Sequence, residues 1–285
     1  MTRRPEADNR IDARLAELRR QERKAFATYL VADYLDADGT LAHMRLLARN
    51  GVDVIEVGYP FSDPILDGAV IQAMNRKAVS AGGNLARTID LCAAFRADDG
   101  STPLILMGYA NPIATMGYGE FARRAAAAGV DGVIIGDMPL REAAPLAAEL
   151  SVTGLRFIPL AAPTLPAQEF VSGAPGVGGF LYCIPVIGPT GGPSATERET
   201  KQAVERCRAA TSLPIIVGFG IKSPAAATAA ASYGDGVAVA SALLERLQAD
   251  CQKQGVKRAL EIQSSEVAAY RRALDGERTD AAVPR

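Results

Sequence analysis

The chain has 285 residues, which fits one large α/β barrel or two ordinary domains and allows a substantial core. Its composition, 48% hydrophobic and 22% charged, is that of a globular protein, and a net charge of −1 gives no general attraction for nucleic acid or an anionic membrane. No apolar run is long enough to span a membrane, and the N-terminus lacks the apolar region of a secretory signal. We therefore expect a cytoplasmic protein that binds neither nucleic acid nor membrane.

Residues 1–24 precede the first apolar run, and the stretch from about 10 to 24 is charged with a helical pattern. We predict an N-terminal helical extension that either covers the bottom of the following domain or extends into solvent. At the other end, residues 276–285 are polar and have the composition of a disordered tail.

Between these ends, short apolar runs alternate with helical stretches. The predicted strands are 25–32, 52–58, 103–109, 131–137, 155–162, 178–184, 213–219 and 235–241. Most are continuously apolar, which is typical of parallel strands buried on both faces. The predicted helices are 40–49, 69–80, 84–96, 118–128, 141–150, 195–209 and 223–233.

Eight strand–helix units joined by short connections predict an α/β fold, a single (β/α)8 TIM barrel over residues 25–275 with an extra N-terminal helix. A doubly wound open sheet is the alternative, but no GxGxxG motif follows the first strand.

Cysteine and histidine are sparse. The four cysteines form no CxxC pair and lie in apolar or helical stretches, so we expect isolated thiols. His43, the only histidine, lies in a predicted helix, where a residue of the helix face is the expected role. These counts argue against a zinc or non-haem iron site and against a Ser-His-Asp triad.

In a barrel of this kind the site lies at the carboxyl ends of the strands. Glu56 lies inside the apolar strand DVIEVG, so burial should raise its pKa and suit it to give and take a proton near neutrality. A buried structural ion pair is the alternative, but we favour catalysis. Asp67 follows in a loop rich in turn formers, and from the local pattern alone an N-cap of the next helix is its simpler interpretation.

Turns at predicted helix starts follow the last three predicted strands: two are glycine-rich, at 187–194 and 218–221, and the third is Ala240-Ser241. Such turns at helix starts present free backbone N–H groups to an anion, and barrels often hold phosphate after strands seven and eight. Their coincidence predicts a phosphate site.

The segment EVGYPFSDPILDGAVIQ (56–72) resembles the signature of the tryptophan synthase alpha chain family, usually of the form ELGxPFSDPxADGPxIQ. The resemblance covers about residues 25 to 250. It continues through LMGYANP, GVIIGDMP, APT, FLY, PTGG, GFGI and SAL.

This resemblance implies retro-aldol cleavage of indole-3-glycerol phosphate to indole and glyceraldehyde 3-phosphate, without metal or organic cofactor. It implies that Glu56 is the general acid–base and that Asp67 is catalytic, holding the indole N–H, and not a cap. The other implied positions bind substrate (Tyr29, Tyr109, Thr190 and Phe219) or its phosphate (Gly191, Gly220, Ala240 and Ser241).

Three departures from the family pattern stand out. VADYLD replaces a Gly-Asp-Pro turn after the first strand, and Ala240 replaces a phosphate-site glycine. The loop 185–193 has Val186 in place of the usual arginine and contains three prolines, at 185, 189 and 193.

Three interpretations remain open at this point: a subunit working with a tryptophan synthase beta subunit, a stand-alone indole-producing lyase of a specialised pathway, and a non-catalytic barrel that binds or activates a partner. Retention of both carboxylates argues against the third. PFSDP resembles a segment that contacts the beta subunit and favours the first, whereas the altered loop favours the second.

Overall fold

The computed structural model describes residues 9–166, 175–186, 194–218 and 220–276, and its strands form one parallel sheet in the order β5-β4-β3-β2-β1-β9-β8-β7-β6. The strands are β1 (Ala25–Val31), β2 (Val54–Gly58), β3 (Leu104–Gly108), β4 (Gly132–Ile135), β5 (Arg156–Phe157), β6 (Leu160–Ala161), β7 (Leu181–Cys183), β8 (Ile215–Gly218) and β9 (Gly236–Val239).

The two ends of this strand order are halves of one segment, because only Ile158 and Pro159 separate β5 from β6. β5 pairs with β4, and the Ile158 N–H continues this pairing with a hydrogen bond to the Val133 carbonyl (2.9 Å). β6 pairs with β7, and the Pro159 carbonyl accepts from the Tyr182 N–H (3.0 Å). The segment therefore closes the sheet into a barrel, which confirms the eight predicted strands and the (β/α)8 fold.

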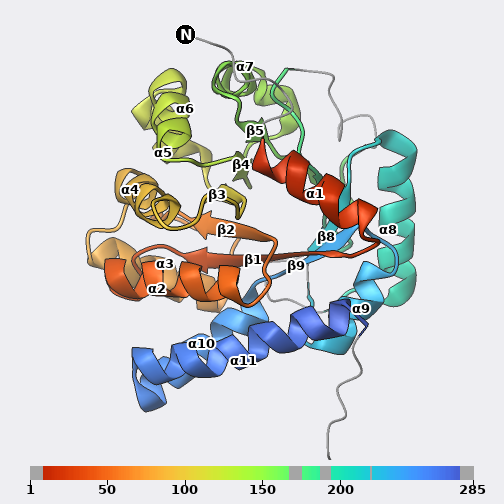
Figure 1. Cartoon of the computed structure of the whole chain (residues 1–285). Coiled ribbons are helices and arrows are strands. Elements are labelled where there is room, and N and C mark those ends of the chain that lie inside the picture. Colours follow the sequence, from red (N-terminus) through yellow and green to blue (C-terminus); the bar gives the residue numbers. More distant parts are fainter. Residues whose placement is uncertain (1–8, 167–174, 187–193, 219, 277–285) are drawn as a thin grey trace, which may run out of the picture.

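Helices surround the barrel (Figure 1). They are α1 (Arg10–Arg20), α2 (Asp36–Arg49), α3 (Ala69–Ser80), α4 (Leu85–Arg96), α5 (Ala110–Met116), α6 (Tyr118–Ala127), η2 (Leu140–Glu142), α7 (Ala144–Thr153), α8 (Glu197–Ala210), α9 (Pro224–Ala231), α10 (Ser241–Gln254) and α11 (Val256–Leu274). The predicted helix ranges do not include α5, α10 or α11, although the turn at 240–241 is expected to open a helix. In the part of the chain that the structure describes, no helix has the length and apolar character needed to cross a membrane.

The N-terminal helix α1 covers the end of the barrel where the strands begin (Figure 1). Asn9 caps it, accepting from the Ile11 N–H (3.0 Å), and the buried face of Ile11, Leu15 and Leu18 packs against inward residues such as Val54. The extension thus covers the barrel bottom, and the alternative that it extends into solvent is wrong. The predicted tail lies outside the described residues apart from Gly276.

Buried aspartates hold the beginnings of the strands at this bottom end. Asp53 accepts from the Phe26 N–H (2.8 Å) and pairs with Arg14 (2.6 Å) and Arg271 (2.9 Å). Asp131 repeats the arrangement, with partners Leu104 N–H (2.9 Å), Arg10 (2.7 Å) and Arg96 (3.2 Å). Each carboxylate therefore has two cations and a backbone donor, which compensates for the loss of water around its charge.

Candidate active site

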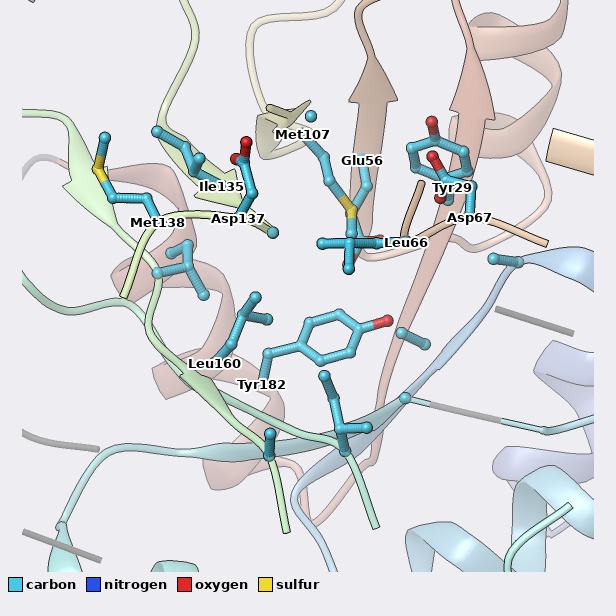
Figure 2. A pocket seen from close by; sticks show the side chains of 18 of the residues that line it. Tyr29, Glu56, Leu66, Asp67, Met107, Ile135, Asp137, Met138, Leu160 and Tyr182 are labelled. Atoms are coloured by element: carbon cyan, nitrogen blue, oxygen red, sulfur yellow. The ribbon is translucent and has the colours of Figure 1, made fainter. Parts of the chain in front are cut away.

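A pocket of about 480 Å³ opens at the carboxyl ends of the strands (Figure 2). It brings together most of the residues singled out from the sequence: Tyr29, Glu56, Asp67, Tyr109, Gly220, Ala240 and Ser241. The remaining three, Thr190, Gly191 and Phe219, lie outside the described residues. The pocket thus joins the expected catalytic residues and part of the expected phosphate site in one cavity.

Glu56 lies in the middle of β2 and points into the barrel beside Tyr29, its partner in the register of β1. The residue is 1% exposed, and its Oε1 atom has no hydrogen-bond partner among the described residues. Burial raises the pKa of Glu56 from 4.5 to about 8. The expected raised pKa is confirmed, whereas the described residues provide no cation for the alternative, a structural ion pair.

Asp67 lies in the loop between β2 and α3. The Tyr109 hydroxyl donates to Asp67 Oδ2 (3.0 Å) and accepts from the Leu66 N–H (3.1 Å), so one phenol fixes both the carboxyl group and the loop. Burial raises the pKa of Asp67 from 3.8 to about 6, and the bond from Tyr109 acts in the opposite direction. The N-cap of α3 is Gly68, with no side-chain hydrogen bond, so the capping interpretation of Asp67 is wrong.

The two carboxyl groups therefore differ at neutral pH. With a pKa of about 8, Glu56 is mostly protonated at pH 7 and can donate a proton. With a pKa of about 6, Asp67 is mostly ionised and can stabilise a positive charge. One pocket thus holds a neutral acid and an anion, the division of roles that acid–base catalysis needs.

Strand alternation supplies further pocket residues that the sequence reasoning missed, including Met107, Leu160 and Tyr182 (Figure 2). Tyr182 needs a glycine opposite it: a Cβ atom on Gly218 would lie 2.3 Å from the Tyr182 hydroxyl oxygen. The period of two along each strand was the available signal, because residues two apart point to the same side. This period alone does not show which of the two sets of alternating residues faces the inside of the barrel, so it could not identify the pocket residues.

The part of the pocket lined by Ala240 and Ser241 has features that suit the binding of an anion. Helix α10 begins at Ser241, and its N-cap residue Ala240 has no side-chain group that could accept from the N–H groups of the first turn. By contrast, the Ser223 side chain caps α9 by accepting from the Ala226 N–H (3.2 Å). The described pocket lining contains no lysine or arginine, so backbone N–H groups and the Ser241 hydroxyl would have to hold an anion.

The altered loop is described only at its start. Val186, which replaces the family's arginine, lines the pocket, while residues 187–193 lie outside the described part of the chain. Within the described parts, no group of three or more histidine, cysteine, aspartate or glutamate residues is arranged to hold a metal ion.

A closed parallel barrel that holds Glu56 and Asp67, both with raised pKa values, in a pocket at the carboxyl ends of its strands has the architecture of a barrel enzyme. The family model described as "Tryptophan synthase alpha chain" matches residues 15–272. The chain belongs to the tryptophan synthase alpha chain family.

Individual relatives agree with this assignment. The chain is 42% identical to the tryptophan synthase alpha chain of Caulobacter sp. (strain K31) over 261 residues, which are 91% of this chain and 95% of the relative. It is 45% identical to that of Phenylobacterium zucineum (strain HLK1), covering 84% and 86% of the two chains. The crystal structure of the subunit from Legionella pneumophila str. Paris is similar, with a TM-score of 0.86, 33% identity and coverage of 94% and 99%.

Proposed function

We propose that this chain is a lyase of tryptophan biosynthesis that cleaves indole-3-glycerol phosphate to indole and glyceraldehyde 3-phosphate, with Glu56 and Asp67 as its catalytic residues. The observation that carries the assignment of these residues is their shared pocket, in which one carboxyl group has a pKa of about 8 and the other of about 6. The family supports the reaction, and the pocket supports the roles.

Glu56 begins the reaction protonated. It gives its proton to the indole ring carbon that carries the glycerol phosphate chain, which makes the ring cationic. The resulting carboxylate then takes the proton of the adjacent glycerol hydroxyl, as the carbon–carbon bond breaks and its electron pair returns to the ring. The aldehyde forms and Glu56 regains its proton, so one group serves as acid and base in turn.

Asp67 stabilises the intermediate cation. Its carboxylate binds the indole N–H, where positive charge develops when the ring is protonated. Tyr109 orients this carboxylate by donating to Oδ2, which leaves Oδ1 for the substrate. The electrons move entirely within the substrate, so the reaction needs neither a metal nor an organic cofactor.

The remaining residues bind the substrate. We assign the phosphate to Gly191, Gly220, Ala240 and Ser241, and the walls around the indole to Tyr29, Tyr109, Thr190 and Phe219. The uncapped start of α10 at Ser241 supports the phosphate assignment. The Ala240 methyl group narrows this site, so Ala240→Gly should tighten the binding of glycerol phosphate.

The partner is part of the proposal. We propose that the chain works with a tryptophan synthase beta subunit that receives the indole, because its relatives are named as alpha chains. We assign both subunits to the cytoplasm. A stand-alone indole-producing lyase is the second candidate, favoured by Val186 in place of the arginine. A barrel that only binds or activates a partner fits less well, since it would not need the carboxyl groups of Glu56 and Asp67 together in one pocket.

Purified chain alone, given indole-3-glycerol phosphate, should release indole and glyceraldehyde 3-phosphate in equal amounts. The Glu56→Gln variant, folded and assayed in parallel, controls for contaminating enzyme. Absence of indole from the wild-type chain with and without a beta subunit would overturn the proposed reaction. A large rise in turnover with saturating beta subunit identifies an ordinary synthase subunit, and no rise identifies the stand-alone lyase.

A further inference from the structure

Two adjacent aliphatic side chains follow the PFSDP segment, and only one of them belongs to the pocket. Leu66 lines the cavity and is 45% exposed, whereas Ile65 is 76% exposed and lies outside the pocket lining. Figure 2 shows Leu66 pointing into the cavity, as Glu56 and Tyr182 do. A half-exposed leucine inside a pocket has apolar surface that a bound ligand can cover.

The backbone of Leu66 is held in place. Its N–H donates to the Tyr109 hydroxyl (3.1 Å), and the Tyr109 ring stacks on Phe61 with the ring centroids 5.1 Å apart. Asp67, the next residue, receives a hydrogen bond from the same hydroxyl. Leu66 is therefore fixed beside the carboxylate that holds the indole N–H in the proposed reaction.

The side chain of Leu66 lies beside Gly136, the residue that follows β4. A Cβ atom added to Gly136 would lie 3.1 Å from Leu66 Cδ1, so the absence of a side chain at position 136 gives the leucine its space. The neighbouring lining residues Met107 and Ile135 are also apolar. The family signature has alanine at the position of Leu66, so this chain has a larger side chain here than that pattern.

We propose that Leu66 is a specificity-determining residue, which packs against the aromatic ring of the substrate and limits the size of substituents that the ring can carry. The inference rests on the proposed function, because it takes the ring beside Asp67 to be an indole. Gly136 acts indirectly in this arrangement, because its lack of a side chain leaves room for Leu66 beside the end of β4.

The test uses the reverse reaction of glyceraldehyde 3-phosphate with indole or with ring-methylated indoles. Leu66→Ala should raise kcat/KM for the methylated indoles relative to indole by about tenfold, the scale on which a pocket discriminates small apolar groups. Ile65→Ala is the matched control and should leave this ratio as in the wild-type chain. An unchanged ratio in Leu66→Ala, or an equal change in both variants, would overturn the proposal.

A double-mutant cycle tests the contact with Gly136. Gly136→Ala should lower kcat/KM for indole when Leu66 is present and should have a smaller effect in the Leu66→Ala background. Equal effects in the two backgrounds would contradict the arrangement.

Calorimetric binding of the same indoles to the wild-type chain, Leu66→Ala and Ile65→Ala separates a failure of the proposed reaction from a failure of the proposed role of Leu66. If the wild-type chain shows no turnover, the proposed reaction fails, while the binding ratio still tests Leu66. If the wild-type chain is active and both ratios are unaffected by Leu66→Ala, only the role of Leu66 fails.

Discussion

The carboxyl groups at the two ends of the barrel have different partners. At the bottom, Asp53 and Asp131 each have two arginines and a backbone N–H. At the top, Glu56 is as deeply buried but has an oxygen without a partner among the described residues, and Asp67 accepts from the hydroxyl of Tyr109. Burial alone therefore does not distinguish a candidate catalytic carboxyl group from a structural one. For Glu56, burial raises the pKa to about 8, in the range where a proton can be exchanged, and no described residue supplies a cation beside it.

The largest expected effect comes from removing the titratable group at the top. Glu56→Gln should lower turnover by about 100- to 10,000-fold, because the amide can neither donate nor take up the proton. Stability should not fall, since the amide is close in shape and has no charge to bury. Initial rates of indole release, together with thermal unfolding, check both parts. Turnover within about tenfold of wild type would remove Glu56 as the general acid–base.

The opposite result is expected at the bottom. Asp53→Asn leaves Arg14 and Arg271 without their buried anion and should cost about 3–5 kcal/mol in the free energy of unfolding. Turnover per folded molecule should remain unchanged, because Asp53 is at the far end from the pocket. The matched control is Asp98→Asn, which removes a surface pair with Arg45 and should cost about 1 kcal/mol or less. A loss of turnover without a loss of stability in Asp53→Asn would contradict the division between the two ends.

Asp67→Asn tests charge while keeping shape. The amide can still contact the indole N–H but carries no negative charge, so turnover should fall by about 100-fold or more while substrate still binds. Single-turnover kinetics and calorimetric binding of substrate separate these two effects. Survival of activity would show that a polar side chain of this shape is sufficient and that its charge contributes nothing to catalysis.

The same contrast explains what the sequence could predict. Continuous apolar runs predicted all eight strands. The position of Glu56 inside one of these runs was enough to predict a buried carboxyl group with a raised pKa, because that inference needs only the neighbouring residues in the sequence. The interruption of the sheet at Pro159 and the placement of Leu66 beside Gly136 depend on which segments lie side by side in the fold. Asp53 and Asp131 lie at the beginnings of predicted strands, but the arginines that pair with them come from distant segments and could not be matched to them.

For Asp67, local pattern alone favoured a helix cap, and only the longer motif indicated catalysis. The structure shows why the local pattern misled. The cap position belongs to Gly68, and the hydroxyl that holds Asp67 comes from Tyr109, 42 residues further along the chain. A hydrogen bond over that separation leaves no signal in the sequence around the loop.

The smallest expected effect is a difference in how stability depends on pH. The pKa of Glu56 is about 8 in the folded chain against an ordinary value of 4.5, so the folded state binds more protons than the unfolded state between these values. The free energy of unfolding therefore falls as pH rises through this window, by about 2 kcal/mol between pH 6 and pH 8 from this group. Asp67 acts in the same direction, but mostly below its pKa of about 6.

Glu56→Gln should remove this contribution, so the stability of the variant relative to wild type should increase from pH 6 to pH 8. Asp53→Asn is the comparison from the bottom end, and its loss of stability relative to wild type should stay nearly constant over the same range, because the substitution removes contacts with Arg14 and Arg271 and leaves Glu56 unchanged. Urea unfolding of the three chains at pH 6, 7 and 8 measures both differences. A constant difference between Glu56→Gln and wild type would mean that Glu56 is already ionised at pH 6 in the folded chain. It could then no longer be the group that starts the reaction protonated.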